Sequence, residues 1–419
     1  METIAGAVVF DNRPARETPL IQPQAVWVHP SGDLYIADGN FLVRRVRGGI
    51  STIVAGGGAL IDDSIPIPAR NAHLDFPGGL AGTASGELFI SDVRHNRIRR
   101  LNPDGTLVTV VGRGTEGFSG DGGRGAFAEL SRPRAIALSD AGDLYIADTR
   151  NFRIRKFNLR TGIITSVAGT GESGYSGDGG LATEAKVGEV GAVAVDAAGN
   201  LYLTDTENFV VRKVSGNGVI TTVAGNRRYG FSGDGGPATQ ASISGGWGLA
   251  LDAAGNLYLA DSENSRIRVV NPSGVINTYA GRGVTAGQPK NPGVENVAAT
   301  EVVLGMPFAI ALDTRGNLFI PESIGDLVRR VDAQTRIITT VAGTTNPFDG
   351  IAALDAPLVR PTDVAADSAG NLYVADNGHF RIRKLDASTG RITTIAGDGI
   401  EAGAAGSTSN SIGSGLSIS

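Results

Sequence analysis

The chain of 419 residues contains no cysteine and only four histidines. The absence of cysteine excludes disulfides, thiolate metal sites and cysteine nucleophiles, and it leaves the redox compartment open. No apolar stretch approaches the roughly 18 residues that a membrane span requires. The 37 basic and 42 acidic residues give a net charge of −5, and they form no run that would indicate a nucleic-acid-binding or acidic tail.

The two ends of the chain carry different signals. The start, METIAGAVVF, has no basic segment and no apolar core of signal-peptide length, which fits a cytoplasmic protein or a mature secreted domain. Of the two, we expect an extracytoplasmic or secreted protein. Residues 398–419 end in the Gly/Ser-rich segment GSTSNSIGSGLSIS, so we expect a flexible tail or linker there and a single domain over residues 1–397.

A short apolar run that ends in an acidic residue recurs seven times. The acids are Asp38, Asp92, Asp148, Asp205, Asp261, Glu322 and Asp376. Their numbers differ in succession by 54, 56, 57, 56, 61 and 54. A period this regular predicts one repeat architecture in place of the two or three domains that the length alone would allow.

Each period contains four short strand-like segments. The fourth copy reads GAVAVD, AAGN, LYLTD, TENF, VVRKV, SGNG and VITTVAG, in which β-branched runs alternate with Gly, Asn and Asp turns. Such units predict an all-β fold, a seven-bladed β-propeller of four-stranded antiparallel blades. We expect the inner strands to begin near Pro23, Pro77, Pro133, Val190, Gly246, Pro307 and Pro361.

Several of these copies resemble NHL repeats. The resemblance is carried by AGDLYIADTRNFRIRKF (141–157), GNLYLADSENSRIRVV (255–270) and AGNLYVADNGHFRIRKL (369–385), and by the loop GTGESGYSGDGGLATEAKV, which is similar to the inter-repeat loop of bacterial NHL proteins. It extends over residues 3–397. The resemblance implies a propeller and leaves the function open, because propellers serve as lyases, lactonases, RNA binders and scaffolds.

Two features repeat from copy to copy, and we interpret both as structural. An arginine in the third strand occurs in every copy, at Arg44, Arg99, Arg155, Arg212, Arg268, Arg329 and Arg383. We expect it to form an ion pair or a turn-capping hydrogen bond, and the alternative is a charged ring that holds a ligand. The Ser-Gly-Asp-Gly-Gly loops each offer one aspartate, which is too few for calcium, and the aromatic residue before each loop is expected to plug the groove between blades.

Residues that break the repeat are better candidates for a site, because a ligand without sevenfold symmetry needs residues that are not repeated. The strand order places the Asp-x-x-Asn turns and the Ser-Gly-Asp-Gly-Gly loops on one face, and the starts of the inner strands surround the channel mouth. The candidate ligand-binding residues are Arg134, Trp247, Phe308 and Asp363, joined by His95 and His379, which replace the turn asparagine in copies two and seven. The structural alternatives are that Trp247 and Phe308 only fill the channel and that the two histidines are solvated turn residues.

The enzyme alternatives find little support in the sequence. The peptidylglycine amidating lyases carry a similar Asp-x-x-x-His turn, but they also have metal-binding histidines at the inner-strand starts. Those positions here are Gln24, Gly78, Arg134, Gly191, Trp247, Phe308 and Thr362. Lactonase-type propellers bind a metal through Glu, Asn and Asp at the axis, where only Glu189 and Asp363 occur here. We therefore expect no metal, no cofactor and no catalytic residues.

These observations favour a non-catalytic binding or scaffold propeller that recognises a protein, peptide or glycan on one face. The alternatives are a metal-dependent lyase or lactonase and an RNA-binding NHL domain, which would need a basic face with aromatics. We expect a monomer without a nucleic-acid partner. The segment ETIAG (2–6) is an eighth copy of the fourth-strand pattern, and we expect it to close the last blade in place of ITTIAG (392–397).

Overall fold

The computed structural model describes residues 11–39, 41–61, 65–284, 294–343, 349–353, 356, 358, 361–376 and 381–396. These residues form seven antiparallel sheets of four or five strands, and the only helices among them are three-residue 3₁₀ segments. None of the described helices has the length and apolar character needed to cross a bilayer. The prediction of an all-β propeller with seven sheets is confirmed.

The first three sheets follow one another along the chain. Sheet one contains β1 (Arg13–Pro14), β2 (Ala25–Val28), β3 (Leu34–Asp38), β4 (Leu42–Arg47) and β5 (Ile50–Gly56). Sheet two contains β6 (Ile67–Pro68), β7 (Pro77–Gly82), β8 (Leu88–Asp92), β9 (Arg97–Leu101) and β10 (Thr106–Val111). Sheet three contains β11 (Pro133–Leu138), β12 (Asp143–Asp148), β13 (Arg153–Asn158) and β14 (Ile164–Ala168).

The remaining four sheets repeat this order. Sheet four contains β15 (Val190–Val195), β16 (Leu201–Asp205), β17 (Val210–Val214) and β18 (Ile220–Ala224). Sheet five contains β19 (Gly246–Leu251), β20 (Leu257–Asp261), β21 (Arg266–Val270) and β22 (Ile276–Ala280). Sheet six contains β23 (Val297–Ala298), β24 (Ala311–Leu312), β25 (Leu318–Glu322), β26 (Leu327–Val331) and β27 (Ile337–Gly343). Sheet seven contains β28 (Ile351–Ala352), β29 (Pro361–Ala366), β30 (Leu372–Asp376), β31 (Arg381–Leu385) and β32 (Arg391–Ala396).

The 3₁₀ segments lie in the connectors between sheets or in the turns after the second strand. The connector helices are η1 (Ala15–Glu17), η2 (Ala69–Asn71), η3 (Gly125–Phe127), η5 (Ala182–Glu184), η6 (Ala238–Gln240) and η8 (Ala299–Glu301). The turn helices are η4 (Thr149–Asn151) and η7 (Ser262–Asn264). Each connector helix from η2 onward packs against the outermost long strand of the preceding sheet, as η3 does on β10.

The inner strands begin close to the predicted residues. Five start at the predicted positions, whereas β2 starts at Ala25 and β24 starts at Ala311. In sheet six, Pro307 forms only an isolated bridge to Glu322, which accounts for the short β24. Where the starts are regular, the register places each one beside the acid that ends the second strand, as Pro133 lies beside Asp148.

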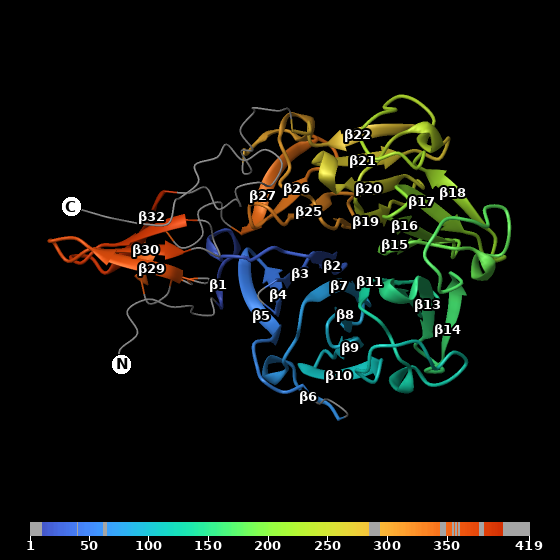
Figure 1. The fold of residues 1–419 in the computed structure, drawn as a ribbon, viewed down its shortest axis with the longest axis horizontal. Helices are drawn as coiled ribbons and strands as arrows, with labels where there is room; N and C mark the ends of the chain where they lie inside the picture. The colour runs from blue at the N-terminus through green and yellow to red at the C-terminus, as the bar shows by residue number, and fades with distance from the viewer. Residues whose placement is uncertain are drawn as a thin grey trace.

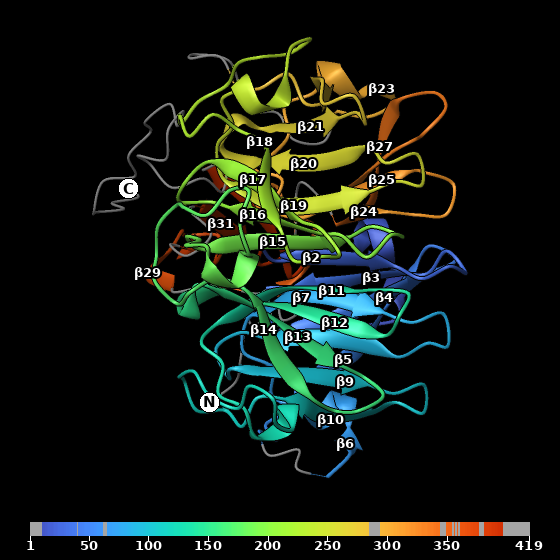
Figure 2. The same ribbon diagram turned by 90° about the vertical axis from the view of Figure 1, so that its right-hand side faces the viewer.

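Six of the seven sheets surround a common axis, with β2, β7, β11, β15 and β19 near its centre (Figure 1). In the view turned by 90° the strands run along this axis (Figure 2). The apolar cores lie between the faces of neighbouring sheets, as in the cluster that joins Ile90 of sheet two to Tyr35 of sheet one. The propeller therefore consists of radially packed sheets with a narrow axial channel.

The first and sixth sheets contact each other directly. Val26 and Ile36 of sheet one share an apolar cluster with Phe319 and Val328 of sheet six, and η1 packs on β27. The backbone N–H of Gln22 also donates to Asp326 Oδ1 at 2.8 Å. Sheet seven lies beside this ring, outside the six sheets (Figure 1). The ring therefore closes with six sheets and not with the seven that the number of copies predicted, because the connector of the first sheet occupies the position on β27.

Residues 1–10 and 397–419 lie outside the described residues. The strand predicted at residues 2–6 and the tail predicted at residues 398–419 therefore stay predictions. We expect deletion of residues 1–10 to lower the melting temperature more than deletion of residues 398–419 does.

Candidate functional site

The repeated arginines are buried and paired, which confirms their structural interpretation. In sheet three, Arg155 Nη2 lies 2.7 Å from Asp121 Oδ1 and Arg155 Nη1 lies 3.4 Å from Asp148 Oδ2. Asn151 donates from Nδ2 to Asp148 Oδ2 at 2.8 Å and to the carbonyl oxygen of Gly117 at 2.7 Å. The turn and the connector loop thus lie on one face, as predicted, and we call it the connector face.

Sequence reasoning missed the second partner of these arginines. The aspartate of each Ser-Gly-Asp-Gly-Gly loop pairs with the arginine of the sheet that follows the loop. Asp178 pairs with Arg212 at 2.6 Å, and Asp234 pairs with Arg268 at 2.7 Å. The spacing of 34 residues is the same in both pairs, so the constant distance along the chain was the available signal. These loops are ion-paired connectors.

The aromatic residues before these loops cover the arginines and do not plug a groove. The ring of Phe118 lies 3.9 Å from Arg153 Cζ and 4.9 Å from Arg155 Cζ. Phe231 stacks in the same way on Arg266 at 3.7 Å. Phe118 remains 40% exposed, so the predicted plug was wrong. The cation attracts the ring face, which shields the buried ion pair from water.

Two of the candidate residues lie away from the channel, and a third falls outside the described residues. His95 Nδ1 lies 2.9 Å from Asp92 Oδ2 and takes the place of the turn asparagine, and its ring meets His73 edge-on at 5.2 Å. Asp363 lies exposed on β29 in sheet seven, apart from the other candidates. His379 lies outside the described residues.

The other three candidates line one cavity in the axial channel. Each of the six ring sheets contributes the residue at its inner-strand start: Gln24, Gly78, Arg134, Gly191, Trp247 and Phe308. The cavity has a volume of about 70 Å³. Pockets for drug-sized molecules occupy roughly 300–1,000 Å³, so this cavity accepts a small chemical group and not a whole ligand of that size.

Arg134, Trp247 and Phe308 form a compact cluster from three sheets. The two rings are stacked, with centroids 5.3 Å apart and planes inclined by 11°. Arg134 Cζ lies 4.3 Å from the centroid of Trp247 and 4.7 Å from that of Phe308. Arg134 starts in sheet three, whereas the rings belong to sheets five and six, so its side chain extends past sheet four across the channel.

The Arg134 guanidinium forms no hydrogen bond or ion pair in the part of the chain that the structure describes. Burial lowers the pKa of Arg134 to about 10, and the nearby Glu189 carboxylate opposes this shift, so the side chain stays protonated at neutral pH. Arg134 is half-buried, and charges withdrawn from water in proteins are normally paired. The buried Oε1 of Gln24, in the same cavity, also lacks a hydrogen-bond partner. The channel therefore offers an unpaired cation and an unpaired acceptor.

Phe76 is a further residue beside the cluster that sequence reasoning missed. Its ring lies 5.9 Å from Arg134 Cζ and 5.5 Å from Arg94 Cζ. Phe76 directly precedes β7, two residues before the inner-strand position occupied by Gly78. The available signal was an aromatic residue at a position where the neighbouring copies have Gln22 and Arg132.

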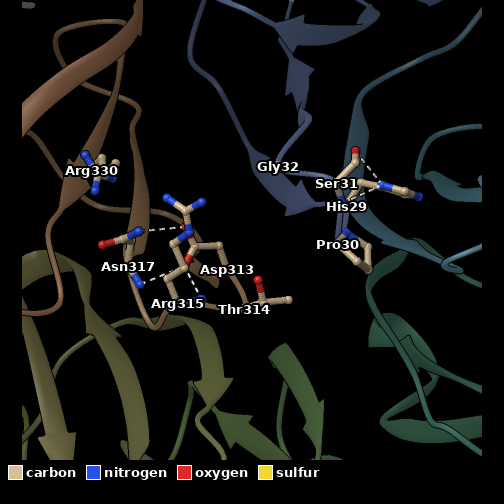
Figure 3. Close-up of a pocket in the computed structure, with 9 residues that line it drawn as sticks. All are labelled: His29, Pro30, Ser31, Gly32, Asp313, Thr314, Arg315, Asn317 and Arg330. Carbon is tan, nitrogen blue, oxygen red and sulfur yellow. Dashed lines mark hydrogen bonds between the residues drawn. The ribbon is translucent and has the colours of Figure 1, made fainter.

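A larger cleft lies between the hairpin turns of sheets one and six (Figure 3). It has a volume of about 360 Å³ and is lined by His29, Ser31, Asp313, Arg315, Asn317 and Arg330, among others. Asp313 already accepts from the backbone N–H of Arg315 and Asn317 and from Asn317 Nδ2. The same carboxylate-to-asparagine turn recurs at Asp252. Asp313 and Asn317 therefore belong to the repeated architecture, Arg330 is already paired with Asp332, and we favour the channel as the site.

Among the described residues, no three histidine, aspartate or glutamate side chains lie close enough together to hold a metal ion. The channel itself presents a cation and aromatic rings, which do not bind metals in this arrangement.

The comparisons with known proteins identify the repeats. A family model described as NHL repeat matches residues 130–157, 247–270 and 358–385. The chain contains NHL repeats. This NHL chain is 28% identical over 377 residues to the Arabidopsis thaliana protein SUPPRESSOR OF QUENCHING 1, chloroplastic, covering 81% of this chain and 34% of that protein. It is 30% identical over 363 residues to Teneurin-3 of Mus musculus, covering 77% of this chain and 13% of Teneurin-3.

A solved structure of an auxiliary nutrient binding protein from Bacteroides ovatus has the same fold. Its TM-score is 0.54 at 14% identity, and the match covers 81% of this chain and 76% of that chain. A likeness at this identity shows the fold alone. The NHL chain spans about a third or less of the curated relatives described above.

Proposed function

We propose that the NHL propeller is a non-catalytic binding module that receives the carboxylate of a protein or peptide ligand in its axial channel. The observation that carries this proposal is the half-buried guanidinium of Arg134, which lies against the Trp247 ring in the channel and has no described acceptor. A carboxylate is its natural complement, because a guanidinium fork can donate two parallel hydrogen bonds to it.

The size and surroundings of the cavity favour a peptide terminus or acidic side chain over a glycan. A volume of about 70 Å³ admits a carboxylate, while the rest of the ligand would lie on the connector face. A sugar needs an open ring face on which to stack, but Trp247 is stacked against Phe308 and also contacts Arg134. Gln24 Oε1 adds an acceptor for an N–H or O–H group of the ligand.

We expect the wild-type protein to retain peptides from a random-sequence pool with free C-terminal carboxylates, and to retain far fewer from the same pool with amidated C termini. Arg134→Met should weaken binding of a recovered peptide by about 10- to 100-fold, because a hydrogen bond to a charged group contributes about 1.5–3 kcal/mol. Isothermal titration calorimetry with the recovered peptide measures the change.

Arg315→Ala is the matched control, since Arg315 is an exposed arginine in the turn between β24 and β25, away from the channel. Trp247→Ala should also weaken binding while leaving the melting temperature near that of the wild type. Equal retention of the two pools, or unchanged affinity in Arg134→Met, would contradict the proposal.

A further inference from the structure

The mouth of the axial channel on the connector face is bordered by two positions in each of sheets two to six. One is the residue just before the inner strand, and the other is the second residue of the turn after the second strand. The register brings the two positions together, because Val190 at the start of β15 pairs with Asp205 at the end of β16, and the other four sheets pair in the same way. We call these positions the rim.

Charge is divided between two sides of the rim. Sheets two and three contribute Arg94, Arg132 and Arg150, sheets four and five contribute Glu189, Glu207 and Glu263, and sheet six contributes the apolar Met306 and Ile324. We call the three arginines the basic sector and the three glutamates the acidic sector. Equivalent positions thus differ in charge from sheet to sheet, so this division is not a product of the repeat.

The glutamate side chains lie over the entry to the inner strands. Glu207 Oε2 lies 2.8 Å from the position that a Cβ on Gly188 would take, and Glu263 Cγ lies 3.0 Å from the corresponding position on Gly245. Glu189 is half-buried and lies near enough to Arg134 to stabilise its positive charge. The acidic sector therefore borders the channel itself.

The acidic sector is not neutralised by the protein. In the described part of the chain its three glutamates form no ion pair, and their hydrogen-bond donors are neutral. Glu207 Oε2 accepts from Ser173 Oγ at 2.6 Å, and Glu263 accepts from the hydroxyl of Tyr229. Lys186, in the connector of sheet four, is already paired with Glu172 at 2.7 Å. A cation that lies against this sector has to come from outside the chain.

The cavity below the rim carries an independent sign of a ligand. Gln24 lines this cavity, is only 5% exposed, and has an Oε1 atom without a hydrogen-bond partner among the described residues. Glu189 stands two residues before Gly191, which lines the same cavity. Two residues of extended chain span at most about 7 Å. A ligand held at Arg134 therefore reaches the acidic sector with the residues next to its carboxylate.

We propose that the acidic sector binds a basic side chain among the last three residues of the ligand. The ligand is then a peptide or protein tail with a lysine or arginine close to its free C-terminal carboxylate. This inference rests on the proposed function, which places that carboxylate at Arg134. Charge complementarity of this kind fixes the orientation of a bound partner and speeds its encounter with the site. An acidic residue at the same place in the ligand would be repelled by the three glutamates.

Six pools of random hexapeptides provide the test. The residue next to the last is fixed as lysine, norleucine or glutamate, and each pool is made with a free carboxylate and with an amidated C terminus. Mass spectrometry measures the amount that immobilised wild-type protein retains. Among the carboxylate pools, we expect the lysine pool to be retained about fivefold more than the glutamate pool, with norleucine between them, since several exposed charges each contribute modestly. Added salt should shrink this preference by screening.

Charge variants assign the preference to the acidic sector. Glu207→Gln/Glu263→Gln should reduce it to about twofold or less, and Glu207→Lys/Glu263→Lys should reverse it. Both glutamates are exposed turn residues, so the melting temperature should stay near that of the wild type. The matched control is Glu184→Gln/Glu301→Gln, which removes the same charge from exposed residues of η5 and η8, packed on the outer strands β14 and β22. This control should keep the wild-type preference.

The outcomes separate this inference from the proposed function. Equal retention of the three carboxylate pools, with the amidated pools excluded, would overturn the inference and leave the proposed function standing. A lysine preference that is unchanged in Glu207→Gln/Glu263→Gln would also overturn it. A preference that depends on these glutamates but is equally strong in the amidated pools would support the acidic sector and contradict the proposed function instead.

Discussion

Replacement of Arg155 by alanine is expected to lower the free energy of unfolding by about 3–5 kcal/mol, the cost of removing one partner from a buried ion pair. The variant leaves the fully buried Asp148 carboxylate without its cation. It also removes the partner of Asp121 and the donor to the carbonyl oxygen of Ser119. Urea denaturation followed by circular dichroism measures the loss.

Arg150→Ala is the matched control, because Arg150 is exposed in the adjacent turn of the same sheet and should change stability by less than about 0.5 kcal/mol. Arg155→Lys should recover only part of the loss, since a lysine cannot donate to both carboxylates in the fork geometry. A loss below about 1 kcal/mol for Arg155→Ala would show that the pair does not hold the connector to the sheet.

Gly248→Ala is expected to destabilise the propeller by about 1–3 kcal/mol through overpacking at the axis. A Cβ at this position would lie 2.7 Å from Cα and 2.8 Å from the carbonyl carbon of Ala309 on the next sheet. Both contacts involve backbone, so the inner strands of sheets five and six would have to separate. Gly248→Val should cost more, because its side chain is larger.

Gly216→Ala is the control for this prediction. A Cβ at Gly216 would meet no atom within 4 Å beyond the adjacent residues, and Gly216 has no positive φ, so a methyl group there lies in open space. Thermal unfolding of the two variants beside the wild type gives the comparison. Equal melting temperatures for Gly248→Ala and Gly216→Ala would mean that the inner strands are not in fixed contact.

Much of the fold could be predicted from the sequence because each copy specifies its own strands and turns. The acid at Asp148, the turn at Asn151 and the arginine at Arg155 are close in sequence and interact within one sheet. Their roles followed from the repeat itself. The pairing of Arg155 with Asp121 was missed, because it bridges a loop whose path the local pattern does not define.

The candidate site was predicted in part. Trp247, Phe308 and Arg134 were recognisable as residues that break the repeat at inner-strand starts, and the structure brings them together. Asp363 occupies a comparable position in its copy but lies outside the channel. The number of sheets in the ring could not be predicted from seven similar copies. Ring size depends on the packing angle between sheets and not on the sequence pattern within a sheet.

The ion pairs that join Arg155, Arg212, Arg268 and Arg383 to the connectors of their own sheets also bear on how the chain folds. Arg212 and Asp178 are separated by 34 residues, as are Arg383 and Asp349, whereas the link from Gln22 to Asp326 spans 304. Contacts with short sequence separation form early, and loop closure over long separations is slow. Each copy can therefore form its own ion pairs and strand pairs early in synthesis, packing of neighbouring sheets buries the apolar cores, and joining the first sheet to the sixth is a late step. Gain or loss of a whole copy would then leave the local ion pairs of the other copies intact, whereas loss of a copy within the ring would remove a sheet on which two neighbours pack.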